Sequence, residues 1–154
     1  MWQRIQTVFL AIVIITLITT IFLPIWVFQD DSGRTHELYP LHYTIVENGQ
    51  RNTQYMPYAI TAILAIASAT LAFIEIRKFK DRVLQMKLGA LNSLFMAGTI
   101  GSSVYFATQL VKTFQGGNYS FGLYLPAIAV ISNLLANRFI RRDEKLVRDS
   151  DRLR

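Results

Sequence analysis

The sequence has 154 residues, of which 52% are hydrophobic and 17% are charged. Soluble domains carry about a quarter charged residues, so this composition, with its apolar residues gathered in long runs, indicates a membrane protein. The chain contains no cysteine, which excludes disulfides, Cys-ligated zinc and iron–sulfur clusters. The net charge is +6, and the basic residues flank the apolar runs. We therefore expect anionic lipid, and not nucleic acid, as the partner of these charges.

The first apolar run covers residues 8–28 and contains no charge. As a helix it would be roughly 32 Å long, enough to cross a hydrocarbon core of about 30 Å. It is longer than the apolar part of a signal peptide, and no small-residue cleavage site follows it, so we read it as an uncleaved helix. Pro24 is expected to kink its last turns, and Trp26 stands where an interfacial aromatic belongs.

Three further runs complete an expected bundle of four transmembrane helices. They cover residues 57–76, 88–111 and 119–140. The fold class predicted is an all-α membrane protein in a single domain, residues 1–154. The helices would be joined by an outer loop at 29–56 and a cytoplasmic loop at 77–87, and followed by a cytoplasmic tail at 141–154.

The basic residues predict the orientation of the helices. Thirteen of the sixteen Lys and Arg residues fall on the N-terminus, the loop 77–87 and the tail, whereas Arg34, Arg51 and Lys112 fall on the other side. The positive-inside rule then places both termini in the cytoplasm.

The outer loop 29–56 contains a turn signal. Asn48-Gly49 lies between Tyr43, Ile45 and the segment 50–55. An Asn-Gly pair between such segments favours a tight hairpin, so we expect a small two-stranded ribbon on the outside of the bundle.

Few residues suggest chemistry. His36, Glu37 and His42 are the one group of candidate metal ligands close in sequence, but their spacing matches no metal motif. We interpret them as loop residues in water, and we assign no metal site, no cofactor and no catalytic residue. Glu75 is the only acidic residue within an apolar run and is a candidate functional carboxylate. Its place near the end of the run favours pairing with Arg77, Lys78 or a tail arginine.

Small residues four apart predict close helix packing. The third run carries Gly89, Ser93, Ala97 and Gly101, and the second run carries Ala65 and Ala69. Residues at this spacing line one helix face and let another backbone approach. The face could serve packing within the bundle, which we favour, or contact with another subunit.

The tail predicts a helix that continues out of the membrane. Leu146 follows Phe139 by seven residues and Val147 follows Ile140 by seven, which gives a narrow apolar stripe. We expect Glu75, Asp81 and the tail acids to pair with arginines of the loop 77–87 and the tail, forming a docking platform. The residues assigned to this cytoplasmic edge are Arg77, Lys78, Lys80, Arg82, Arg141, Arg142, Asp143, Glu144, Arg148, Asp151 and Arg152.

Three charged segments resemble those of a known family. They are Gln3-Arg4-Ile5-Gln6-Thr7, the loop with Lys80, Arg82, Gln85 and Leu88, and the segments Asp143-Glu144 and Ser150-Asp151-Arg152-Leu153-Arg154. The chain resembles an uncharacterised family of small four-helix inner-membrane proteins from Gram-negative bacteria, catalogued as domain of unknown function 4293. Trp2 stands where that family has an aliphatic residue. The resemblance implies a bacterial inner membrane and a cytoplasmic edge that matters, and it implies no catalytic residue.

Three functions compete. We expect a non-enzymatic membrane protein, an accessory or structural subunit of a larger assembly, whose partners are membrane lipids and another membrane protein or a second copy of itself. The alternative is a small oligomeric transporter or channel, although the runs show no pair of broken helices. A membrane enzyme acting on lipid or quinone is the third reading, and only Glu75 beside the basic loop speaks for it.

Overall fold

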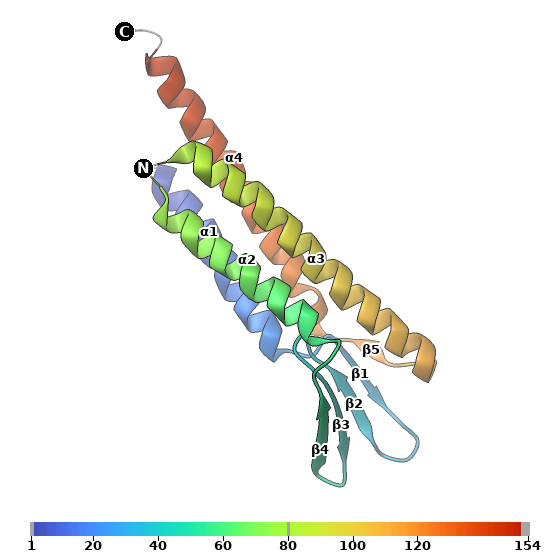
Figure 1. Ribbon diagram of the computed structural model, residues 1–154. Coiled ribbons are helices and arrows are strands. Elements are labelled where there is room, and N and C mark those ends of the chain that lie inside the picture. The colour runs from blue at the N-terminus through green and yellow to red at the C-terminus, as the bar shows by residue number, and fades with distance from the viewer. Residues whose placement is uncertain (1, 80, 152–154) are drawn as a thin grey trace.

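This computed structural model describes residues 2–79 and 81–151, and the side chains of residues 5–79 and 81–149. Within that part of the chain four α-helices lie side by side: α1 (Trp2–Phe22), α2 (Ala59–Arg77), α3 (Arg82–Phe114) and α4 (Leu125–Asp151). α1 and α3 each pack against both α2 and α4, so the helices close into an antiparallel bundle (Figure 1). All four are long and apolar enough to cross a membrane, as the sequence predicts.

A β-sheet lies beyond one end of the bundle (Figure 1). Its strands are β1 (Trp26–Gln29), β2 (Thr35–Leu38), β3 (Tyr43–Glu47), β4 (Gln50–Gln54) and β5 (Asn118–Tyr119). The spatial order is β4-β3-β2-β1-β5, and every neighbouring pair is antiparallel. A short 3₁₀ helix, η1 (Phe121–Leu123), connects β5 to α4.

The prediction of an all-α fold is therefore wrong. The expected hairpin is present as β3–β4, and its turn residues Asn48 and Gly49 have φ of 48° and 79°, the left-handed values that a two-residue hairpin turn needs. However, the hairpin is only part of a five-stranded sheet within the described residues. β1 comes from the end of the first apolar run, and β5 comes from the connection between α3 and α4.

The first helix ends at Phe22, earlier than the predicted residue 28. Pro24 has no backbone N–H to donate, and the next N–H, that of Ile25, donates to the Leu38 carbonyl oxygen of β2 at 2.7 Å. The chain thus joins the sheet directly after the proline. Trp26 is fully buried there and stacks on Phe28 with ring centroids 5.9 Å apart, so it belongs to the sheet and does not end a helix at the interface.

The connection between α2 and α3 is shorter than the predicted loop 77–87. α3 begins at Arg82, because the Asp81 carboxylate accepts a hydrogen bond from the Leu84 N–H at 2.9 Å and caps the helix. At the other end of the chain α4 continues to Asp151, so the tail is helical as far as the structure describes it. The C-terminal part of α4 projects past the other helices (Figure 1).

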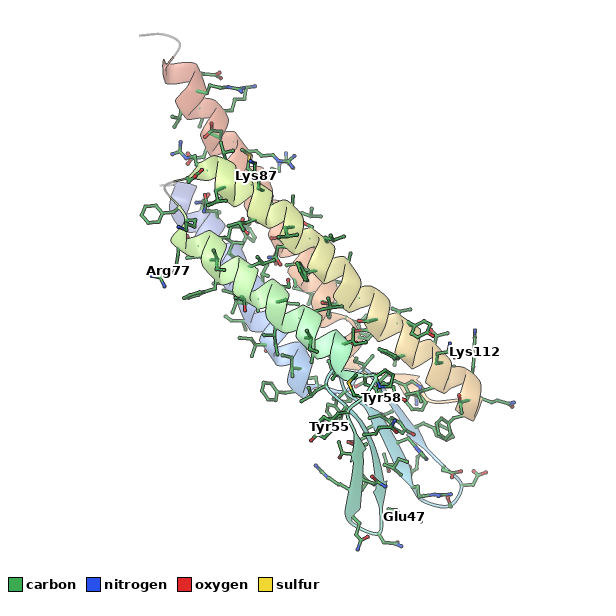
Figure 2. The ribbon with its side chains drawn as sticks, viewed as in Figure 1. Glu47, Tyr55, Tyr58, Arg77, Lys87 and Lys112 are labelled. Carbon is green, nitrogen blue, oxygen red and sulfur yellow. The ribbon has the colours of Figure 1, made fainter. Side chains whose placement is uncertain are left out.

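Two apolar clusters hold the fold together. The first lies inside the bundle and contains Leu10, Val13 and Leu17 of α1 with small residues of the other helices and Met96. The second lies where the sheet meets the bundle, and Trp26, Leu38 and Tyr43 belong to it. We call the end of the bundle that carries the sheet the sheet end. The opposite end, where Figure 2 shows Arg77 and Lys87, we call the basic end.

Candidate functional site

Buried polar side chains join α2 to α3 at three levels of the bundle. Thr61 Oγ1 donates to Ser102 Oγ at 2.9 Å, and Ser68 Oγ donates to Asn92 Oδ1. At the third level the Gln85 Nε2 amide donates to the backbone oxygen of Glu75 at 2.8 Å. The three α2 residues are seven apart, which is nearly two helical turns, so they share one face.

α4 is joined to α3 by asparagines. Asn133 Nδ2 donates to the Gly89 carbonyl oxygen at 3.1 Å and to Ser93 Oγ at 2.9 Å. The side chain of Asn137 lies directly against Gly89, since a Cβ placed on that glycine would meet Asn137 Oδ1 at 2.0 Å. The absence of a side chain at Gly89 is therefore what lets this amide enter the interface.

Glu75 is the centre of the candidate site. Its side chain is 0% exposed, and neither carboxyl oxygen has a hydrogen-bond partner among the described residues. The described residues thus show no pairing of Glu75 with Arg77, Lys78 or a described tail arginine. Arg152 and Arg154 of the tail lie outside the described residues. Other buried atoms in the bundle also lack a partner: Gln85 Oε1, Asn92 Nδ2, Asn133 Oδ1 and Asn137 Oδ1.

The structure divides the predicted packing residues into two groups. Ala65 and Ala69 belong to the bundle core, Gly89 is buried, and Ser93 bonds to both α3 and α4. The other two, Ala97 and Gly101, lie on an exposed face of α3, and a Cβ on Gly101 would meet nothing within 4 Å.

An ion pair connects α3 to α4 at the basic end. Arg82 Nη2 lies 3.1 Å from Asp143 Oδ2, and both side chains are largely buried, with 21% and 17% exposed. This confirms one loop-to-tail pair of the predicted platform. Asp81 instead caps α3.

The remaining residues of the cytoplasmic edge are mostly at the surface. Glu144 is half-buried, and the exposed side chains are those of Arg77, Lys78, Arg141, Arg142 and Arg148. Lys80, Arg152 and the side chain of Asp151 lie outside the described residues.

The apolar stripe of α4 begins inside the bundle and continues beyond it. Phe139 stacks on Phe9 of α1 with ring centroids 5.6 Å apart, and Ile140 is fully buried. Seven residues later, Leu146 and Val147 are 55% and 39% exposed. We call residues 144–151 the α4 extension.

The sheet end buries one of the histidines that we expected in water. His36 is 5% exposed and its Nδ1 lies 2.6 Å from Tyr43 Oη, with Phe114 packed against its ring. Burial lowers the pKa of His36 and raises the pKa of Tyr43 to about 12, so both are neutral at pH 7. His36 and Glu37 are neighbours on β2 and point to opposite faces of the sheet. The described residues contain no cluster of three His, Cys, Asp or Glu side chains suited to a metal ion.

Sequence reasoning missed Gln85 and Asn137 as members of the site. Asn92 and Asn133 bond between helices, whereas Gln109, the other strongly polar side chain of α3, is exposed. Asn137 could have been found, because it follows Asn133 by one helical turn. Gln85 was named only among the residues of the family resemblance. Its bond to Glu75 could not be predicted from a helical pattern, since Gln85 lies outside the predicted helix.

Comparison with known proteins gives a family and no function. No curated protein matches the sequence. A family model matches residues 2–153, almost the whole chain. The protein therefore belongs to the family described as Domain of unknown function (DUF4293).

Proposed function

We propose that the protein is a non-enzymatic subunit of a larger assembly in the bacterial inner membrane, with its basic end in the cytoplasm. The orientation rests on the excess of Lys and Arg in the segments at the basic end, where Arg77 and Lys87 lie, while Lys112 lies near the sheet (Figure 2). When the Lys and Arg residues of a helix bundle gather at one end, that end usually stays on the cytoplasmic side of the membrane.

The α4 extension carries the proposal of a docking role. The stripe contacts α1 through Phe139, buries Ile140 and runs on to Leu146, which is exposed. Around it the extension mixes acids and bases, and acids weaken any hold on anionic lipid, where each base contributes only about 1 kcal/mol. The pattern suits a partner helix that continues the packing of α1 and matches the mixed charges.

Site-specific photocross-linking tests this docking. A photoreactive residue at Leu146 should give one discrete cross-linked product in cells, because the apolar stripe would face the partner. The matched control places the photoreactive residue at Lys145, which is turned about 100° around the helix. This variant should give little of the cross-linked product. Equal products at both positions, or products with lipid alone, would refute a docked stripe.

A second candidate is a small oligomeric transporter or channel. The exposed Ala97 and Gly101 continue a small-residue face, beside a groove lined by Leu64, Leu94 and Phe95. Such a face lets a second helix approach closely. A pore through the centre of a single bundle is disfavoured, because apolar side chains fill the space between the helices, among them Leu10, Leu17 and Met96. Native gel electrophoresis in mild detergent would show the stable homo-oligomer that this candidate requires.

A further inference from the structure

Glu75 differs from every other charged side chain that the structure describes. It is the only Asp, Glu, Lys or Arg among the buried residues, and both of its carboxyl oxygens lack a partner. The nearest basic residues in sequence, Arg77 and Lys78, are exposed, and Arg82 is engaged with Asp143. Among the described side chains, none forms a hydrogen bond or ion pair that would compensate a negative charge at this position.

An ionised carboxylate in such surroundings is costly. Charged side chains buried within membrane-spanning helices are costly and are normally paired. Binding one proton removes the charge and converts one oxygen into a hydrogen-bond donor. The closed bundle therefore favours Glu75 in its neutral form.

Gln85 offers the acceptor that a protonated Glu75 needs. Its Nε2 donates to the Glu75 backbone oxygen at 2.8 Å, which fixes the orientation of the amide and leaves Oε1 buried without a donor. The carboxyl group and this amide oxygen thus lack complementary partners at the same contact between α2 and α3. A proton on Glu75 would supply the donor that Gln85 Oε1 lacks.

The other elements at this end add no buried charge. The buried polar residues that α1, α3 and α4 contribute here are Gln6, Gln85 and Asn137. The charged groups are at the surface, on α2 (Arg77, Lys78), on α3 (Lys87) and on α4 (Arg138, Arg141), apart from the Arg82–Asp143 pair. Arg4 of α1 lies outside the described side chains.

We propose that Glu75 is a proton-binding site, in which the carboxyl O–H donates to Gln85 Oε1 and the proton is exchanged with water at the basic end. Because Glu75 is fully enclosed, this exchange requires water to reach the contact between α2 and α3. Release leaves a carboxylate on Glu75 and a free proton in the water.

Infrared spectroscopy of the purified full-length protein in detergent tests the proposal. At neutral pH the wild type should show the carbonyl band of a protonated carboxylic acid, because exposed carboxyl groups are ionised there. Glu75→Gln, nearly the same shape without an acid, should lose the band completely. Glu47→Gln removes an exposed acid at the sheet end and should leave it unchanged. A wild type without this band, or a Glu75→Gln variant that keeps it, would overturn the proposal.

Two further measurements test the acceptor and the ligand. Gln85→Leu removes the acceptor and should shift the band toward that of a carboxyl group free of hydrogen bonds, and an unshifted band would overturn the role of Gln85. Titration to alkaline pH should remove the band at the same pH in sodium chloride and in choline chloride. Loss of the band at lower pH in sodium chloride would mean that sodium replaces the proton, and the site would then be a cation site.

Discussion

At the scale of single residues, amides determine how closely the helices pack. Asn133 uses both hydrogens of its amide on α3, donating to Gly89 and to Ser93. Asn137, one turn further along α4, fits against the bare backbone of Gly89. Interhelical hydrogen bonds of this kind contribute roughly 0.6–2 kcal/mol each in membranes, and they are directional, so they set the register of α3 against α4 where apolar packing alone would let it slide.

Alanine substitutions of the glycines on the two sides of α3 should therefore affect the stability of the protein differently. Gly89→Ala forces the Asn137 amide to move, and we expect a loss of about 1–3 kcal/mol of stability, typical of overpacking. Gly101→Ala places its methyl group in open space and should leave the thermal stability of the monomer in detergent unchanged or slightly raised, since Ala favours helix. Equal destabilisation by both variants would show that Gly101 packs against something beyond this chain.

At the scale of elements, apolar length predicted the helices and could not predict the sheet. Residues 23–28 are as apolar as a helix, yet they bury Trp26 in β1, because Pro24 ends α1 and β2 offers a strand edge. A run of apolar residues does not distinguish helix from buried strand. The hairpin was recognised because Asn48-Gly49 is a local signal, whereas β5 pairs with β1 across most of the chain and leaves no local signal. Glu75 was noticed from sequence, but its lack of partners depends on tertiary packing.

The Arg82–Asp143 pair should fix the base of the α4 extension to α3. Arg82→Asp or Asp143→Arg alone replaces the ion pair by two like charges that face each other, so we expect faster amide hydrogen exchange in residues 144–151 and a loss of about 1 kcal/mol. The double variant, Arg82→Asp with Asp143→Arg, restores opposite charges and should recover slow exchange. If the double variant exchanges as fast as either single variant, the ion pair does not hold the extension.

At the scale of the whole molecule, the two ends have different physical characters. The sheet end is closed by a packed aromatic cluster in which Trp26, Phe28 and Phe114 contact one another. The basic end contains the unpartnered polar atoms of Glu75 and Gln85, and a helix projects from it. The sheet end is thus a packed cap and the basic end is polar. The proposed docking role of the α4 extension depends on whether this basic end faces the cytoplasm.

Cysteine labelling determines that orientation, and the absence of native cysteine means that each introduced thiol is the only one in the chain. Ser32→Cys and Asn48→Cys place exposed thiols at the sheet end, so in intact inner-membrane spheroplasts they should react with a thiol reagent that does not cross the membrane. Lys145→Cys lies on the exposed α4 extension and should react only after the membrane is opened. Because Lys and Arg near helix ends resist translocation, and the basic end holds most of them, we expect this pattern in nearly all molecules. Reaction of Lys145→Cys in sealed spheroplasts, with Ser32→Cys and Asn48→Cys protected, would reverse the orientation, and the α4 extension would then face away from any cytoplasmic partner.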